Sequence, residues 1–155
     1  IMAEGHTIGY HSQTHPMLSQ MSTDRAEADI VRGIAAVDTA LGDLGPGAPF
    51  FRFPYFSATP LLLERMQVRG LDVFGAEQWA SDWNAMAPAA QLDTVMQRLR
   101  RTRGGILLMH DIRSQTAAMV PDFLRALKRG GFSIVHAVPA DREPEVARAR
   151  TRKGS

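Results

Sequence analysis

The sequence contains no cysteine, which excludes disulfide bonds, thiol catalysis and thiolate metal sites. Any metal ion must therefore be held by histidine, aspartate and glutamate side chains. No uninterrupted apolar run reaches the roughly 18 residues that a transmembrane helix needs, so we expect no membrane span. With 45% hydrophobic and 22% charged residues, the 155 residues are typical of one globular domain with a buried core.

The sequence also carries little net charge. It has 18 Lys and Arg against 16 Asp and Glu, a net charge of +2. Residues 141–155 contain five basic and three acidic side chains, so residues 1–140 are close to neutral. A nucleic-acid-binding protein needs a basic face on its folded body, so we expect no nucleic-acid partner. We expect one folded domain over residues 1–140, followed by a basic, flexible tail over residues 141–155.

Short apolar segments alternate with longer amphipathic ones, as strands alternate with helices in a parallel fold. Capping signals such as Thr59 followed by Pro60, and Gly42 after an apolar face, mark helix ends. The expected helices are residues 23–41, 60–70, 88–104 and 114–129. The expected strands are residues 7–11, 50–55, 71–76, 106–109 and 132–138. This alternation predicts an α/β fold with a parallel sheet, open or closed into a barrel.

Polar residues follow four of the expected strands. The carboxyl ends of parallel strands meet at one edge of a sheet or barrel, where reactive groups of such folds gather. The residues at these four strand ends are His11 with His15, Arg52 with Tyr55, Asp82 with Trp83, and His110. The sequence therefore predicts a functional site at this edge.

The first two groups each allow two interpretations. A spacing of four places His11 and His15 on one face of a helical turn, which suits one metal ion; alternatively, they are two exposed polar residues of a loop. Pro54 makes the segment from Arg52 to Tyr55 rigid. A rigid edge can hold an arginine against a carboxylate and direct a backbone N–H at an oxyanion. The alternative is a strand end with a packed tyrosine and a structural ion pair.

The last two groups also each allow two interpretations. Asp82 can orient a histidine, and Trp83 can line an apolar pocket or stack on a sugar; alternatively, they are a helix-capping aspartate and a packed tryptophan. His110 can act as a general acid because imidazole titrates near neutral pH, or it is a histidine at the edge of the core. We expect structural roles for His6 and His136.

Together these segments resemble the polysaccharide deacetylases of carbohydrate esterase family 4, the NodB-homology family. The sequence H-S-Q-T-H from His11 to His15, with its G-H-T-I-G lead-in, resembles the family's second motif. The sequence R-F-P-Y, ending at Tyr55, resembles the third. The pair Asp82 and Trp83 resembles the fourth motif, and L-M-H, ending at His110, resembles the fifth. Four short motifs in the family's order are more specific than any one of them. The resemblance extends from residue 1 to about residue 138 and implies a parallel-stranded (β/α) barrel of the polysaccharide deacetylase type.

The resemblance implies a metal-dependent hydrolase that removes N-acetyl groups from an amino-sugar polymer or oligomer, peptidoglycan-like or chitin-like, and releases acetate. His11 and His15 would ligate a divalent metal, usually Zn2+, which polarises the acetamide carbonyl and activates a water. The backbone N–H of Tyr55 would stabilise the oxyanion. A protein with this substrate, an N-acetylated glycan, is expected in the periplasm, outside the cell or at the cell envelope.

The resemblance also assigns roles to the remaining motif residues. His110 would protonate the leaving amine, and Asp82 would hold His110 in orientation. Trp83 and Leu108 would line the slot for the acetyl methyl group. Arg52 would pair with the catalytic base and keep that base ionised.

One part of the family pattern has no counterpart. The family's first motif contains an Asp-Asp pair that supplies the base and a further metal ligand, and no two aspartates are adjacent in this sequence. We therefore expect a barrel that is incomplete at its N-terminus, with a missing N-terminal segment or a second chain supplying the pair. Two alternatives stay open: a non-catalytic carbohydrate-binding homologue that lost its base, and a related amidase on the same fold.

Overall fold

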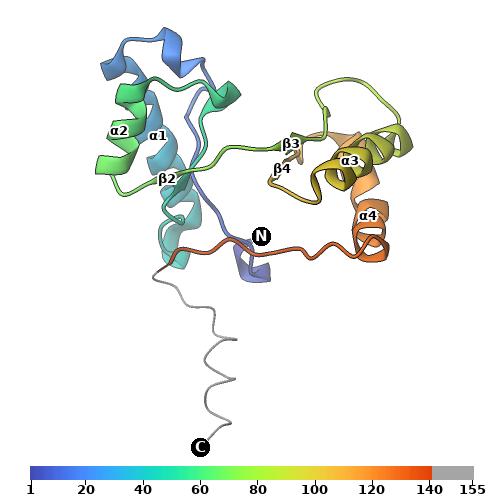
Figure 1. Ribbon diagram of the computed structural model, residues 1–155. Coiled ribbons are helices and arrows are strands. Elements are labelled where there is room, and N and C mark those ends of the chain that lie inside the picture. Colours follow the sequence, from blue (N-terminus) through green and yellow to red (C-terminus); the bar gives the residue numbers. More distant parts are fainter. Residues whose placement is uncertain (141–155) are drawn as a thin grey trace, which may run out of the picture. The chain divides into compact units, whose positions relative to one another are not determined.

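The computed structural model describes residues 1–140. The basic tail expected over residues 141–155 lies outside the described residues. The described chain divides into two compact units. The first unit comprises Ile1–Phe74 and the segment that begins at His136, and the second comprises Gly75–Val135. Figure 1 shows α1 beside α2 in the first unit and α3 beside α4 in the second.

The first unit consists of two helices and a short parallel strand pair. The helices are α1 (Thr23–Leu41) and α2 (Pro60–Val68), and the strands are β1 (Phe50–Phe51) and β2 (Asp72–Val73). Phe50 pairs with Asp72, and Phe51 pairs with Val73. Single 3₁₀ turns cover Met2–Glu4, Leu18–Gln20, Gly42–Leu44 and Pro54–Phe56.

Both helices of the first unit form where their sequence signals predicted them. α1 buries Ala26 and Ile30, and its end is capped by Gly42, whose φ of 53° is in the left-handed region. At the start of α2 the Thr59 hydroxyl accepts a hydrogen bond from the Leu62 N–H at 3.2 Å, and Pro60 occupies the first helical position.

The core of the first unit joins these helices to β1. Its buried members are Tyr10, Leu18, Ala26, Ile30, Phe51, Phe53, Leu62 and Met66. The strand expected over residues 7–11 is reduced to a single parallel bridge between Tyr10 and Phe51. Two hydrogen bonds hold that bridge: the Tyr10 N–H donates to Phe50 O at 2.7 Å, and the Arg52 N–H donates to Tyr10 O at 3.1 Å.

The second unit repeats the same plan. It contains α3 (Pro88–Thr102), α4 (Ser114–Arg129) and the parallel strands β3 (Gln78–Trp79) and β4 (Leu107–Leu108). α3 and α4 pack against each other. The buried core residues are Ala80, Val95, Met96, Leu99, Met119, Phe123, Ala126 and Leu127. The predicted α/β class with parallel pairing is therefore confirmed in each unit.

Other strand predictions were also wrong. The expected strand 132–138 does not form: its residues have no regular secondary structure, and Ile134 and Val135 are 70% and 85% exposed. Apolar alternation gives a strand only where a neighbouring strand pairs with the backbone. The two-residue strand β3, Gln78–Trp79, was not predicted. The strand expected over residues 106–109 is shortened to Leu107–Leu108, and Ile106 is exposed.

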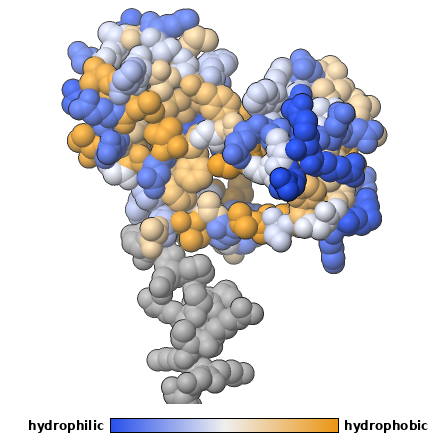
Figure 2. Space-filling view, in the orientation of Figure 1, coloured by the Kyte–Doolittle hydropathy of each residue, from blue (hydrophilic) through white to orange (hydrophobic). Residues whose placement is uncertain are grey.

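The surface of the first unit includes apolar side chains. Figure 2 shows orange patches on its visible face, and Leu61, Leu63 and Val68 of α2 are among the exposed apolar residues. Within residues 1–140, no helix has both the length and the hydropathy to cross a bilayer.

Candidate active site

The first unit brings together three of the residues predicted to act at the site. The His11 and His15 ring centroids lie 5.0 Å apart with the rings at 73°. The His15 and Tyr55 centroids lie 4.8 Å apart at 72°. His15 and Tyr55 have φ values of 54° and 53°, in the left-handed region that side chains other than glycine rarely adopt. Such strain persists only where the surrounding structure enforces it, and it is concentrated at functional sites.

The orientation of His11 is fixed by a hydrogen bond to the third motif. Its Nδ1 lies within hydrogen-bonding distance of the Arg52 carbonyl oxygen. A carbonyl can only accept, so Nδ1 carries the proton and Nε2 is the nitrogen with the lone pair. Metal-binding histidines are commonly oriented in this way, through a backbone carbonyl that sets the tautomer. Arg52 thus contributes through its backbone, a role that its position in the sequence did not suggest.

Arg52 and Tyr55 lie at the end of β1, at the point where the chain leaves the sheet. Arg52 is partly buried, and burial lowers the pKa of its guanidinium. Pro54 is buried and begins a 3₁₀ turn that carries Tyr55 to the surface, with its side chain exposed. The expected strand therefore ends at Phe51, and the rigid segment predicted around Pro54 is a turn.

A buried aspartate on α1 holds the loop between the two histidines. Asp29 is 1% exposed. It accepts hydrogen bonds from the Gln13 N–H and the Thr14 N–H, each at 3.1 Å, and from the Thr14 hydroxyl at 2.8 Å. Burial raises the pKa of Asp29, but the hydrogen bonds from Thr14 and Arg32 outweigh burial and bring this pKa below its ordinary value.

Asp29 was not predicted as a site residue. Its type is ordinary on a helix, and no motif includes it. One signal was present in the sequence: Asp29 shares a helical face with Ala26, Ile30 and Gly33, all of which are buried. A carboxylate on an otherwise apolar or small-residue face must find partners inside the protein.

The second unit brings together Asp82 and His110. The His110 Nδ1 lies 2.8 Å from Asp82 Oδ1, and the His110 backbone N–H donates to Asp82 Oδ2 at 2.6 Å. Because the ionised carboxylate accepts, Nδ1 carries a proton and the neutral ring keeps its lone pair on Nε2. Asp82 is 1% exposed, whereas the His110 side chain is partly open to solvent.

Two further buried residues extend this pair into the core. The Thr116 hydroxyl on α4 donates to Asp82 Oδ2 at 3.0 Å, and the Gln91 side-chain amide on α3 donates to the Thr116 hydroxyl at 2.9 Å. Burial raises the pKa of Asp82, but the hydrogen bonds from His110 and Thr116 bring it below its ordinary value. Asp82 is therefore an ionised carboxylate, and both of its oxygens accept hydrogen bonds from His110 or Thr116.

The alternatives left open for the fourth motif can now be decided. Asp82 caps no helix, since α3 has Ala87 at its N-cap, and Trp83 is 50% exposed and not packed in the core. Leu108 is partly buried in β4, opposite Trp79 of β3. Trp83 thus offers an aromatic surface to solvent next to the carboxylate that holds His110.

The other histidines lie outside both groups. The Thr7 hydroxyl donates to Ala137 O at 2.8 Å, so His136 Nε2, 2.6 Å from the same hydroxyl oxygen, acts as the donor to it. This contact ties two distant parts of the first unit together, in line with the structural role expected of His136. His6 is exposed.

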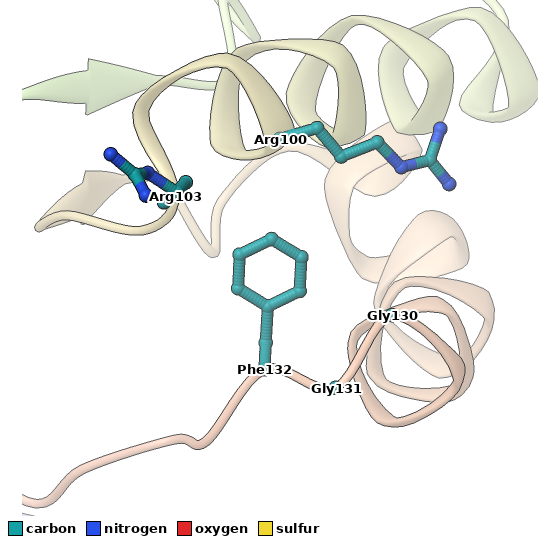
Figure 3. A pocket seen from close by; sticks show the side chains of 5 residues that line it. All are labelled: Arg100, Arg103, Gly130, Gly131 and Phe132. Carbon is teal, nitrogen blue, oxygen red and sulfur yellow. The ribbon is translucent and has the colours of Figure 1, made fainter.

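The second unit also has an open hollow of about 340 Å³, lined by Arg100, Arg103, Gly130, Gly131 and Phe132. Figure 3 shows the Phe132 ring between the two arginine side chains, whose guanidinium groups point away from each other. The cations do not converge on one ligand, and none of the predicted site residues lines this hollow.

The donor set for a metal is partial. Among residues 1–140, no three histidine, aspartate or glutamate side chains are grouped so as to hold a metal ion. His11 and His15 suit two positions of a metal shell, in spacing and in the tautomer of His11. A catalytic zinc ion ordinarily has three protein ligands. His11 and His15 therefore fit two of the three ligand positions.

Comparisons with known proteins connect both groups to one family. The family model for polysaccharide deacetylase matches residues 1–74. A peptidoglycan-N-acetylglucosamine deacetylase of Listeria monocytogenes is 31% identical over 137 residues, which cover 86% of this chain and 27% of that protein. A chitin deacetylase of Pestalotiopsis sp. is 30% identical over 139 residues, which cover 86% of this chain and 44% of that protein.

Solved structures give the same result for the fold. A peptidoglycan deacetylase of Bdellovibrio bacteriovorus superposes with a TM-score of 0.79 and 30% identity, over 94% of this chain and 40% of that one. A family 4 carbohydrate esterase from Streptomyces lividans, in complex with acetate, superposes with a TM-score of 0.73 and 27% identity, over 84% of this chain and 65% of that one.

In all four comparisons the chain spans less than two thirds of the relative's length. The (β/α) fold of the polysaccharide deacetylase type, predicted from the sequence, is confirmed by these likenesses. The chain belongs to the polysaccharide deacetylase family, carbohydrate esterase family 4.

Proposed function

We propose that this chain is part of a metal-dependent N-deacetylase that hydrolyses the acetamide group of an amino-sugar polymer or oligomer. The amide C–N bond breaks, the acyl carbon takes the oxygen of water, and acetate and a free amino sugar are released. The Asp82–His110 pair carries this proposal. A buried carboxylate that fixes one ring nitrogen of a partly exposed histidine prepares the other nitrogen for proton transfer.

His110 is proposed as the general acid that protonates the leaving amine at its Nε2. Asp82 holds the ring through Nδ1, so Nε2 is the nitrogen from which the proton is given. The second hydrogen bond, from the His110 backbone to the same carboxylate, fixes the residue as well as the ring. Trp83 and Leu108 are proposed to surround the acetyl methyl group.

His11 and His15 are proposed as metal ligands, with His11 binding through Nε2 because Nδ1 is bonded to the Arg52 carbonyl. A bound divalent metal such as zinc would polarise the amide carbonyl and lower the pKa of a bound water. The backbone N–H of Tyr55 is proposed to donate to the oxyanion. Arg52 is proposed to keep the catalytic base ionised.

The base and a further metal ligand are proposed to come from outside these 155 residues, either from another part of a longer protein or from a second chain. The sequence has no adjacent aspartates to supply both. The substrate class follows from the relatives, which are named as deacetylases of peptidoglycan, chitin and chitooligosaccharides. With such substrates we propose a location at the cell envelope or outside the cell, and one deacetylase domain over residues 1–140.

A second candidate is a carbohydrate-binding homologue without catalysis. The lack of an Asp-Asp pair in this sequence favours it. One structure of the same fold, from Bacillus anthracis, is described as a pseudoenzyme of the family; it superposes with a TM-score of 0.66 at 22% identity.

The two candidates differ in acetate release. We would measure acetate from chitooligosaccharides and from peptidoglycan with added Zn2+, using the 155-residue chain and the native-length protein that contains it. His110→Ala is expected to reduce the rate by roughly 10²–10⁴-fold, whereas His6→Ala, a matched histidine outside both groups, leaves the rate unchanged. Glycan binding without acetate release from the native-length protein would support the second candidate. Full activity of His110→Ala would contradict the assignment of His110.

A further inference from the structure

The loop between His11 and His15 depends on Asp29 of α1. The carboxylate is buried, and its two oxygens accept hydrogen bonds from different donors. Oδ1 accepts from the Gln13 and Thr14 backbone N–H groups, and Oδ2 accepts from the Thr14 hydroxyl and from Arg32 at 2.8 Å. Hydrogen bonds to a buried ionised acceptor are shorter and stronger than those between neutral groups. Asp29 therefore holds two of the three residues between the histidines, Gln13 and Thr14.

The rest of the loop is fixed against the same helix. The Gln13 N–H also lies 3.2 Å from the Asp29 backbone carbonyl, and the Ser12 hydroxyl accepts from the His15 N–H at 3.2 Å. Gly33, one turn after Asp29, lets the loop backbone touch α1: a Cβ at Gly33 would lie 2.4 Å from the His11 carbonyl oxygen. The loop thus rests on the helix, with Asp29 as its polar anchor.

This anchoring decides where the two imidazoles lie. His11 and His15 are the two ends of the loop, and Asp29 binds the residues between them. His15 adopts a left-handed φ of 54°, a conformation that persists only when neighbouring contacts impose it. Without the anchor the loop would relax, and the 5.0 Å separation of the two rings would no longer be enforced.

We propose that Asp29 is a positioning residue that holds His11 and His15 at the spacing needed for a shared metal ion. It touches neither ring, and it acts through the loop backbone and Thr14. This inference rests on the proposed metal-binding role of the histidine pair. Outer partners of metal ligands commonly change metal affinity by about 10–100-fold when they are replaced.

The test compares Asp29→Asn with a matched variant, Asp38→Asn. Asp38 lies on the same helix and also ties α1 to the chain, accepting from the Tyr10 hydroxyl at 2.8 Å and the Gly47 N–H at 3.0 Å, but it does not contact the histidine loop. In Asp29→Asn the amide NH2 replaces an acceptor and faces the Thr14 hydroxyl and Arg32. Each variant loses a carboxylate that accepts hydrogen bonds on α1, but only Asp29→Asn changes the contacts with the loop between His11 and His15.

We would titrate the 155-residue chain with Zn2+ by calorimetry and record amide hydrogen exchange and histidine ring NMR signals without metal. Asp29→Asn should weaken Zn2+ binding by about 10-fold or more, speed the exchange of the Gln13 and Thr14 amides, and shift the ring signals of the pair. Asp38→Asn should leave all three readouts of the loop near wild type. Equal behaviour of the two variants would overturn the inference.

A milder variant covers the case in which Asp29→Asn does not fold. Thr14 is exposed, so Thr14→Val removes one donor to Asp29 with little effect on the core; it should weaken Zn2+ binding by several-fold, and Thr14→Ser should restore it. Wild-type Zn2+ binding in Thr14→Val would count against Asp29. If the wild-type chain binds no Zn2+, the proposed metal role fails, while exchange and ring signals still decide whether Asp29 positions the loop.

Discussion

Replacement of Thr116 by valine should cost the second unit much of its stability. The change keeps the shape of the side chain and replaces its hydroxyl by a methyl group. That hydroxyl donates to Asp82 Oδ2 at 3.0 Å and accepts from the Gln91 side-chain amide at 2.9 Å. Asp82 and Gln91 are 1% and 0% exposed, so water does not replace either lost partner without a structural change.

The size of the loss follows from these two contacts. A hydrogen bond to a charged group contributes about 1.5–3 kcal/mol, and a buried donor left without an acceptor costs about 1–3 kcal/mol. The added methyl group gains about 0.8 kcal/mol from apolar burial. We therefore expect the free energy of unfolding to fall by about 2–5 kcal/mol near neutral pH.

The pH dependence of the loss has a definite sign. The Thr116 hydrogen bond is one of the causes that bring the pKa of Asp82 below its ordinary value. A depressed carboxyl pKa contributes stability above the unfolded pKa of about 3.9, and this contribution is lost as the pH falls towards the folded pKa. Thr116→Val raises the folded pKa of Asp82, so its destabilisation should be greatest near neutral pH and smaller in acid.

Urea unfolding of the 155-residue chain at neutral and acidic pH measures both quantities. Thr116→Ser keeps the hydroxyl and should behave like the wild type. Thr94→Val is the matched control, because the Thr94 hydroxyl donates only to Ala90 O of its own helix on an exposed face; a change within about 0.5 kcal/mol is expected there. The reasoning is refuted if Thr116→Val is no more destabilising than Thr94→Val, or if its effect grows as the pH falls.

Three further predictions test other contacts. Gly33→Ala should destabilise the chain and weaken Zn2+ binding measured by calorimetry, although alanine elsewhere in a helix gains about 1 kcal/mol over glycine, because the new Cβ would meet the His11 carbonyl at 2.4 Å. Thr59→Ala should cost about 1 kcal/mol in urea unfolding, and Thr59→Ser little, because the hydroxyl caps α2. Acidification of the wild type below about pH 4 should lower the urea midpoint, because Asp29 and Asp82 both have depressed pKa values; an unchanged midpoint there would contradict both assignments.

The helices could be predicted from the sequence with ends accurate to within two residues. α1 spans Thr23–Leu41 and α4 spans Ser114–Arg129, the same limits that apolar spacing and the flanking glycines indicated. Helical hydrogen bonds are local, so the signals for a helix lie within its own residues. Strands depend on partners that are distant in the sequence. Residues 132–138 have the right alternation and form no strand, whereas Gln78–Trp79 has little pattern and pairs with β4.

The site divides in the same way. Residues that face solvent or a neighbouring ring, such as His11, His15 and His110, could be proposed from the sequence because they belong to short motifs at strand ends. Of the residues that hold these groups in place, Asp82 was predicted, whereas Asp29 and Thr116 were not. Asp29 binds Thr14 and Gln13, which precede it by 15 and 16 positions in the sequence. Thr116 binds Asp82, which precedes it by 34 positions. Such roles are defined by folded contacts, and no short motif includes these residues.

Both units use a buried carboxylate to hold the group proposed to react. Asp29 and Asp82 are each 1% exposed, and each receives at least three hydrogen bonds that are not part of a helix or strand. A neutral side chain at either position has too few acceptor sites for these donors, because an amide replaces one oxygen with a donor group. A homologue that keeps all four motifs but lacks an acidic residue at the position of Asp29 should therefore bind metal weakly, even though both metal-binding histidines are present. The motifs alone are thus an insufficient description of the proposed site, because Asp29 lies outside them.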